Sequence, residues 1–161
     1  MRALTASEIR TSFVNSSRSK VQSMTLPGLD DVNWDVLDFL GWRDAKSPLR
    51  SYLVTEHGPD LVGIELRAPG TAPPSARRVL CNVCQSTHHG DAVFLYVAPK
   101  AGASGKAGNT VGTDLCADLQ CSRYARGLLK LDLPQGHADP EDRIAGLRER
   151  LDQFVDQVLQ P

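Results

Sequence analysis

Four cysteines, arranged in two pairs, constrain this chain more than any other feature of its sequence. Two residues separate Cys81 from Cys84, and four residues separate Cys116 from Cys121. The short spacing lets one tight turn point both sulfurs at a single ion, and a second pair at the start of a helix can complete a tetrahedron. The pattern therefore predicts one structural Zn²⁺ held by all four thiolates.

Two disulfide bonds are the alternative, because an even number of cysteines in a secreted chain suggests bridges. The residues after Met1 contain no apolar run long enough for a signal peptide, and no stretch approaches the ~18 apolar residues of a membrane span. We therefore expect a cytoplasmic protein without a membrane partner. Paired cysteines in such a reducing compartment more often hold metal, which again favours zinc.

Charge is spread unevenly along a chain whose formal net charge is −1. Residues 77–130 are rich in Lys and Arg, but four thiolates and one Zn²⁺ would leave this segment only about +2. The alternative interpretation of this excess is counter-charge around a dianionic metal site together with a solvated face. The basic surface is thus modest, and the 161 residues fit one domain of ordinary size.

The amino-terminal third is predicted to contain two short helices. Thr5 and Glu8 have the spacing of a capping box, which indicates a helix over about 5–14. Residues 15–29 are interpreted as a helical turn and a loop. A second helix is expected from Asp30 or Asp31 onward and is expected to end at Gly41. Its apolar residues are Trp34, Leu37, Phe39 and Leu40.

The middle of the chain favours strands. Residues 52–55 and 61–66 are β-rich and flank a turn sequence at 57–60, which predicts a hairpin; residues 68–76 follow as a loop. A short strand is expected at 77–80, and the strongest strand signal, at 92–98, can pair with 110–113. A helix that begins near Cys116 would then complete a knuckle, hairpin and helix, the treble-clef arrangement.

The carboxyl-terminal segment predicts a long helix over 140–159. Asp139 is a suitable N-cap, Pro140 suits the first turn, and two acids follow at the positive end of the helix. Its apolar residues recur at helical spacing, so one face must pack on this chain or, as the alternative, on a partner. The expected class is α+β, one domain divided into helices (1–45), sheet plus treble clef (50–133) and the terminal helix (139–159).

No pattern in the sequence indicates catalysis. Four cysteines fill a tetrahedral zinc site and close it to substrate. His88 and His89 are expected to support the site or a turn rather than to bind metal. The glycine-rich segment 101–109 lacks the residues of a phosphate-binding P-loop and is interpreted as a mobile hairpin tip. We therefore expect a binding protein and not an enzyme.

Motifs around the cysteines are similar to those of a known family. They are Cys81-x2-Cys84, Thr87-His88, Ala98-Pro99-Lys100, Gly108-Asn109-x-Val111-Gly112, Cys116-x4-Cys121 with Arg123-Tyr124, and, upstream, Ser12-Phe13-Val14-Asn15 and the run from Asp38 to Asp44. With them the chain resembles the short, actinobacterial-type FusB-type proteins, which bind elongation factor G through a treble-clef zinc domain, the FBP domain. The resemblance implies a non-enzymatic adaptor that docks on elongation factor G, helps it leave the ribosome and, in some members, confers fusidic acid resistance.

Two other functions stay open at this point. The zinc module could bind RNA directly, with basic side chains such as those of Arg77 and Arg78 on the phosphates and Tyr96 or Tyr124 stacked on an RNA base. It could also be a structural domain without a translational role. For the adaptor we expect the hairpin tip and the helix after the second cysteine pair to form one contact surface. The predicted contact residues are Lys100, Lys106, Arg123 and Arg126.

Overall fold

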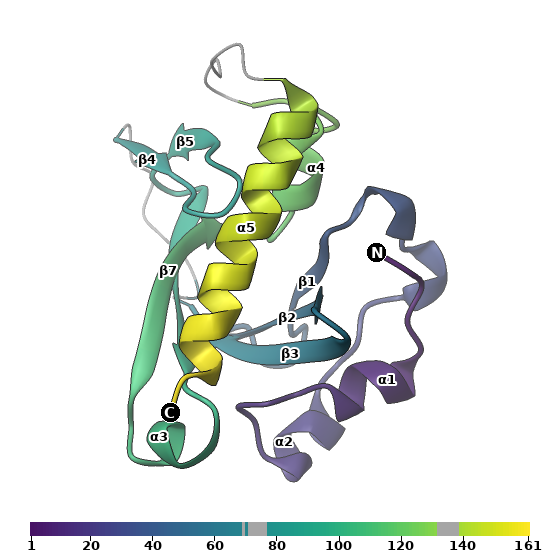
Figure 1. The fold of residues 1–161 in the computed structure, drawn as a ribbon, viewed down its shortest axis with the longest axis vertical. Coiled ribbons are helices and arrows are strands. Elements are labelled where there is room, and N and C mark those ends of the chain that lie inside the picture. Colours follow the sequence, from purple (N-terminus) through teal and green to yellow (C-terminus); the bar gives the residue numbers. More distant parts are fainter. Residues whose placement is uncertain (69, 71–76, 132–138) are drawn as a thin grey trace.

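A five-stranded antiparallel sheet organises the protein, whose computed structural model describes residues 1–68, 70, 77–131 and 139–161 (Figure 1). The strand order is β1-β2-β3-β6-β7. The strands are β1 (Phe39–Arg43), β2 (Arg50–His57), β3 (Asp60–Arg67), β6 (Val93–Pro99) and β7 (Thr110–Cys116). A separate two-stranded ribbon consists of β4 (Arg78–Leu80) and β5 (Thr87–His89). With its helices the fold is α+β, as predicted.

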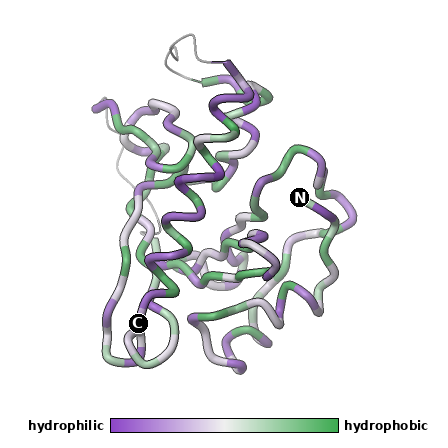
Figure 2. Tube along the Cα trace, viewed as in Figure 1, coloured by the Kyte–Doolittle hydropathy of each residue, from purple (hydrophilic) through white to green (hydrophobic). Residues whose placement is uncertain are grey.

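Helices cover the sheet on both faces. The long helix α5 (Pro140–Leu159) lies against β7 and α4 (Cys121–Ala125) on one side. The short helices α1 (Ala6–Thr11) and α2 (Arg18–Ser23) lie on the other side (Figure 1). Hydrophobic and hydrophilic residues alternate along α5 in Figure 2, as expected for a helix with one buried face. Among the described residues, no helix is long and apolar enough to cross a membrane.

Alternation along the strands builds two separate cores. In β2, Leu53 belongs to one core, while its neighbours Tyr52 and Val54 belong to the other. Successive side chains point to opposite faces of a sheet, so a sheet covered on both faces must be apolar on both. The C-terminal core lies under α5 and includes Leu53, Ile64, Leu66, Tyr96, Leu115, Leu147, Leu151, Val155 and the four cysteines. The N-terminal core comprises Leu4, Ile9, Val21, Met24, Leu40, Trp42, Tyr52 and Val54.

The first and last predicted helices are confirmed. Thr5 and Glu8 form both hydrogen bonds of the capping box, although α1 ends at Thr11 because Phe13 pairs with Gly63 of β3 as an isolated bridge. Asp139 caps α5, and its apolar face is buried within this chain rather than left for a partner. The buried residues of that face are Leu147, Leu151, Phe154, Val155 and Val158.

The predicted second helix is wrong. Residues 29–31 and 34–36 form two 3₁₀ turns, η1 (Leu29–Asp31) and η2 (Trp34–Val36), and the chain then enters β1. Gly41 does not end a helix, since it lies inside β1 opposite Leu53. A Cβ atom at this position would lie 2.7 Å from the Cβ of Leu119, so the close approach of the second cysteine loop requires a glycine.

The predicted strands are confirmed and extended. β2 and β3 pair from Arg50↔Arg67 to His57↔Asp60 through the expected turn, and β6 pairs with β7 along its whole length. Apart from Ala68 and Gly70, the predicted loop at 68–76 lies outside the described residues. The glycine-rich tip between β6 and β7 is not an open loop, because it contains the one-turn helix α3 (Gly102–Lys106).

Candidate metal centre and contact surfaces

The first cysteine pair lies in the turn between β4 and β5. Hydrogen bonds close this turn on itself: the amide of Gln85 donates to the carbonyl of Cys81 at 3.0 Å, and the amide of Cys81 donates to Ser86 at the same distance. Gln85 has a positive φ of 58°, which lets the chain reverse immediately after Cys84. The amide of Asn82 also donates to the carbonyl of Asp114 at 2.8 Å, which ties the turn to β7.

The second pair connects a strand to a helix. Cys116 is the last residue of β7, and Cys121 is the first residue of α4, so the prediction of a helix beginning near Cys116 is corrected by five residues. Leu119, between them, has a φ of 58° and is buried. Such a conformation is unfavourable for a branched side chain and persists only where packing enforces it. Here Leu119 packs against Gly41 of β1.

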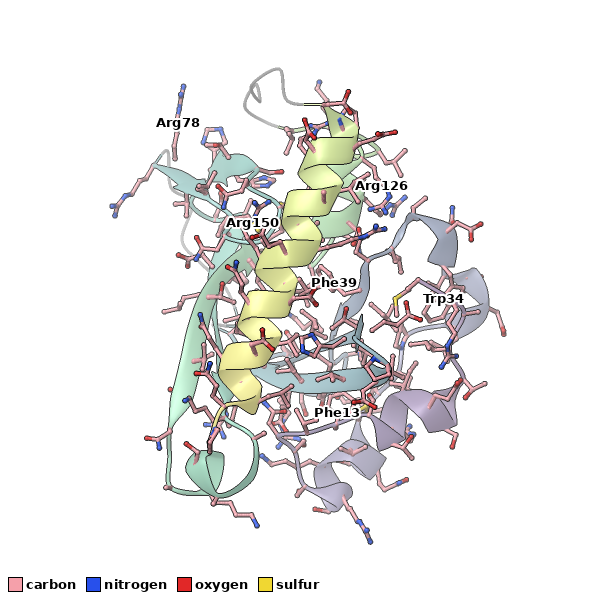
Figure 3. All side chains as sticks on the ribbon, in the orientation of Figure 1. Phe13, Trp34, Phe39, Arg78, Arg126 and Arg150 are labelled. Atoms are coloured by element: carbon pink, nitrogen blue, oxygen red, sulfur yellow. The ribbon has the colours of Figure 1, made fainter. Side chains whose placement is uncertain are left out.

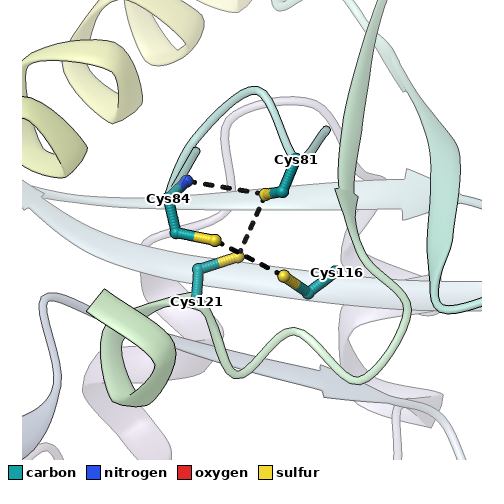
Figure 4. Close-up of side chains that lie close together, drawn as sticks. All are labelled: Cys81, Cys84, Cys116 and Cys121. Atoms are coloured by element: carbon teal, nitrogen blue, oxygen red, sulfur yellow. Dashed lines mark hydrogen bonds between the residues drawn. The ribbon is translucent and has the colours of Figure 1, made fainter. Parts of the chain in front are cut away.

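The four sulfurs converge on one point, as Figure 4 shows. All four cysteines are buried, and their Sγ atoms lie within 4.8 Å of one another. Cys81 and Cys121 are 3.7 Å apart at Sγ, and Cys84 and Cys116 are 3.5 Å apart. A tetrahedral zinc with Zn–S bonds of about 2.3 Å needs sulfur separations of about 3.8 Å, whereas a disulfide needs about 2.05 Å. The donor set therefore fits zinc and not bridges.

The thiols of this cluster do not behave alike. Hydrogen bonds from Cys116, Cys121 and Cys81 lower the pKa of Cys84, because three neighbours can stabilise one thiolate. Hydrogen bonding with Cys116 and Cys81 raises the pKa of Cys121, which is also fully buried. Zinc binding must therefore displace the protons of the remaining thiols, and the two charges of the ion compensate the thiolates formed.

His88 supports the cluster from the side. It is 2% exposed, and its Nε2 atom lies 3.5 Å from the Sγ of Cys116. The ring of Tyr124 contacts that of His88 edge-on, with centroids 4.9 Å apart. Arg150 of α5 donates from Nε to the carbonyl of Val83 at 2.9 Å and holds the first turn against the helix. The expected supporting role of His88 agrees with this position beside a metal ligand.

A buried carboxylate joins this region to the start of β1. Asp38 accepts two hydrogen bonds from Arg126, the residue after α4, one of them at 3.1 Å, and one from Arg148 of α5 at 2.8 Å. Burial would raise the pKa of Asp38, but the two guanidinium groups outweigh it and lower the pKa below its usual value of 3.8. The sequence gives no signal for this triad, because its members are 88 and 110 residues apart.

The four predicted contact residues do not form one surface. Lys100 precedes α3 and Lys106 is its last residue, and α3 lies at the end of β6 and β7 opposite the cysteines. Seven-residue strands are about 20 Å long, so about this distance separates the two lysines from the cysteine end. Arg123 is exposed on α4 beside the second cysteine loop. Arg126, the residue after α4, is committed to Asp38, and 15% of its side chain is exposed. Arg126 therefore positions α4 rather than presenting its charge to a partner.

Arg123 borders an apolar groove that sequence reasoning did not reveal. The groove has a volume of about 440 Å³ and lies between the η1–η2 segment, β1 and the second cysteine loop. Val32, Val36 and Leu37 are half-buried on one wall, and Leu119 forms part of the other. The sequence predicts a helix here and the structure has two 3₁₀ turns, so helical periodicity does not place these side chains on one wall.

The comparisons with known proteins agree with this geometry. A family model described as "FBP C-terminal treble-clef zinc-finger" matches residues 8–158, nearly the whole chain. No curated protein and no solved structure matches it. The treble-clef family and the four buried, clustered cysteines fit one structural Zn²⁺, and the thiolates placed to hold it are those of Cys81, Cys84, Cys116 and Cys121. On the extent of this match, the chain belongs to the FBP C-terminal treble-clef zinc-finger family.

Proposed function

We propose that this protein is a cytoplasmic adaptor of the translation machinery that binds elongation factor G, on or off the ribosome. The family supports this proposal, because the sequence motifs shared with FusB-type proteins lie within the matched residues 8–158. The metal has a structural role in it: four thiolates leave no open coordination position for substrate. Binding, and not catalysis, is the function this site can perform.

The groove beside Arg123 is the observation that carries the proposed contact. Protein interfaces combine an apolar centre with a polar rim, and arginine is enriched among residues that contribute most to affinity. Here the apolar wall is provided by Val32 and Val36, and the exposed guanidinium of Arg123 lies at the rim. Zinc and the Asp38–Arg126 pair hold α4 in place, so the surface is formed before the partner arrives.

Direct binding measurements with purified elongation factor G test this proposal. We expect micromolar or tighter binding by the wild-type protein and a weakening of at least about tenfold by Arg123→Glu or Val36→Asp, since each opposes a rim charge or an apolar contact. Arg78→Glu is the matched control, because Arg78 is an exposed arginine that points away from the molecule (Figure 3). Zinc content and melting temperature should be the same in all variants.

Two results would contradict the proposal. One is the absence of detectable binding to the factor together with micromolar binding to ribosome-free RNA, which would make the protein an RNA-binding module. The other is equal affinity of Arg123→Glu, Val36→Asp and the wild type, which would place the docking surface elsewhere. A direct RNA contact is also recognised by its salt dependence, as 6–10 phosphate contacts lose about 10³–10⁵ in affinity between 50 and 200 mM salt.

A further inference from the structure

A second pocket, at the end of the molecule opposite the cysteines, is lined by positive charge. It has a volume of about 460 Å³ and lies between α3 and the segment that joins α1 to α2. Four of the residues that line this pocket are cationic, and no acidic or aromatic residue lines it. The cations come from three separate parts of the chain, namely α2, β3 and the β6–β7 connection, and are Lys20, Arg67, Lys100 and Lys106.

Most of this charge is uncompensated. Lys20 pairs with the buried carboxylate of Glu65 at 3.3 Å, and Ser16 donates a hydrogen bond to the other oxygen of that carboxylate. Over residues 1–68, 70, 77–131 and 139–161, the side chains of Arg67, Lys100 and Lys106 have neither an ion pair nor a hydrogen bond. Three positive charges therefore face one pocket without an internal partner, an arrangement that costs stability through repulsion unless an anion enters.

The walls of the pocket are fixed by hydrogen bonds. Asn15 donates to the carbonyls of Glu65 and Pro99, at 3.1 and 2.9 Å, and accepts from the amide of Glu65 at 2.7 Å. It thus holds the α1–α2 segment on both β3 and β6. On the other wall, the amide of Ala101 donates to the carbonyl of Val158 at the end of α5, at 2.8 Å.

Gly105 shows how closely the second wall is packed. A Cβ atom at this position would lie 1.8 Å from the carbonyl oxygen of Lys100, so only glycine allows α3 to fold back over the end of β6. Asn109 closes the same turn by donating to Ser104 from its amide and its side chain, at 3.1 and 3.0 Å. The cations are therefore attached to ordered backbone, as a preformed binding site requires.

We propose that this pocket binds phosphate groups, either of an RNA backbone or of a free polyphosphate. A carboxylate carries one negative charge and would leave two of the three cations unbalanced. A diphosphate can balance all three, and two successive backbone phosphates, with one negative charge each, balance two. The volume exceeds that of one phosphate and suits a ligand of nucleotide size. Because no aromatic ring lines the pocket, bases cannot stack there, and recognition is independent of sequence.

This site goes beyond the proposed contact with elongation factor G. It lies at the opposite end of β6 and β7 from Arg123, so the two surfaces can be tested separately. A protein that used both would bind the factor through the groove while holding phosphate at the other end.

The experiment uses the zinc-loaded full chain and two probes, pyrophosphate and a six-nucleotide uridine RNA. The test variant is Lys100→Gln/Lys106→Gln, and the matched control is Lys46→Gln/Arg78→Gln, which removes two exposed charges outside the pocket. At low salt we expect the test variant to bind at least about tenfold more weakly than wild type and the control to change less than about twofold. For the single-stranded RNA, loss of two contacts should reduce the slope of log affinity against log salt by about 1.4.

Nuclear magnetic resonance with either probe locates the site, and the expected amide shifts are confined to residues 14–20, 65–67 and 99–109. Pyrophosphate binding without tighter RNA binding assigns the pocket to a free polyphosphate, and tighter RNA binding assigns it to an RNA backbone; either result supports a phosphate site. The proposal is overturned if neither probe binds at millimolar concentration, or if test and control variants lose affinity equally. It is also overturned if only binding to elongation factor G falls in the test variant, since the pocket then receives a protein.

Discussion

The two faces of the sheet bury their apolar residues by different means. The C-terminal core contains all four cysteines, so its packing is complete only when a metal joins two loops from β4–β5 and β7–α4. The N-terminal core contains no cysteine and closes with apolar and aromatic side chains alone. Strands β1 and β2 contribute residues to both cores, so the two faces share one backbone.

Aromatic contacts in the N-terminal core replace what zinc provides on the other face. The rings of Trp42 and Tyr52 lie with centroids 5.0 Å apart, and Phe13 meets Tyr52 edge-on at 5.7 Å. Both polar atoms find partners: Nε1 of Trp42 donates to the carbonyl of Thr25 at 2.9 Å, and the Tyr52 hydroxyl donates to Asp44 at 3.1 Å. Such contacts tolerate gradual loss, whereas a metal site is lost as a unit.

The largest expected effect is removal of the metal. Cys116→Ser should abolish zinc binding, because zinc binding to small structural sites contributes about 10–16 kcal/mol of folding free energy. We expect residues 77–125 to lose hydrogen-exchange protection first, followed by β2 and β3, which form part of the C-terminal core. Metal analysis and hydrogen exchange measure both effects, with chelator-treated wild type as the comparison. A zinc-free variant with an unchanged melting curve would show that the C-terminal core does not depend on metal.

Sequence reasoning succeeded where the signal was local. The cysteine spacing, the cap at Asp139 and the hairpin turn at 57–60 each depend on a few adjacent residues, and the structure contains all three features. The helix predicted between residues 30 and 41 is wrong, because Phe39, Leu40 and Trp42 fit either the apolar stripe of a helix or a strand that is buried on both faces. Only pairing with β2, a tertiary contact, decides between these patterns.

The binding surfaces were harder to predict for the same reason. Whether a basic residue faces solvent or a buried carboxylate depends on contacts that are distant in sequence. Arg126, for example, contacts Asp38, which lies 88 residues away. The cationic pocket likewise joins Lys20, Arg67 and Lys100, from three parts of the chain that have no common motif. The composition shows that the chain contains these Lys and Arg residues, and the topology determines which of them share a surface.

The next largest effect should come from the metal-free face. Trp42→Ala removes a large side chain from the N-terminal core and should lower the free energy of unfolding by about 3–5 kcal/mol, because the sheet cannot collapse into the cavity. Zinc stoichiometry should stay at one per chain under native conditions, which distinguishes this variant from Cys116→Ser. Urea unfolding monitors stability. Zinc loss in parallel with native-state destabilisation would mean that the two faces are one cooperative unit.

A smaller effect is expected at the ion pairs that join β1 to α4 and α5. Asp38→Asn should cost about 2–3 kcal/mol at pH 7, less than a fully buried pair, since Arg148 is 62% exposed. The folded pKa of Asp38 is lowered, so its contribution is present above the unfolded value of 3.8 and is lost as pH falls through the lower folded value. Wild type and variant should therefore converge in stability below about pH 4, as urea titrations at several pH values can show. A constant difference from pH 7 to pH 3 would contradict this assignment.

The smallest effect compares one tyrosine on each face. Burial and the neighbouring Asp44 carboxylate raise the pKa of Tyr52 to about 12 from the ordinary value of 10. A tyrosine whose pKa is higher in the folded than in the unfolded state contributes its full stability below the unfolded pKa. This contribution is lost as the pH rises through the folded pKa, so wild type should lose stability between about pH 10 and 12. Tyr52→Phe should cost about 0.5–1.5 kcal/mol at pH 7, since Asp44 keeps its backbone hydrogen bonds from Thr25 and Lys46. The variant should also lose less stability in alkali than wild type.

Tyr96→Phe is the matched change in the C-terminal core, where burial also raises the tyrosine pKa and the hydroxyl donates to the carbonyl of Ala117. If Tyr52→Phe retains the full alkaline loss and Tyr96→Phe removes it, the alkaline limit of the fold belongs to the metal-bearing face alone.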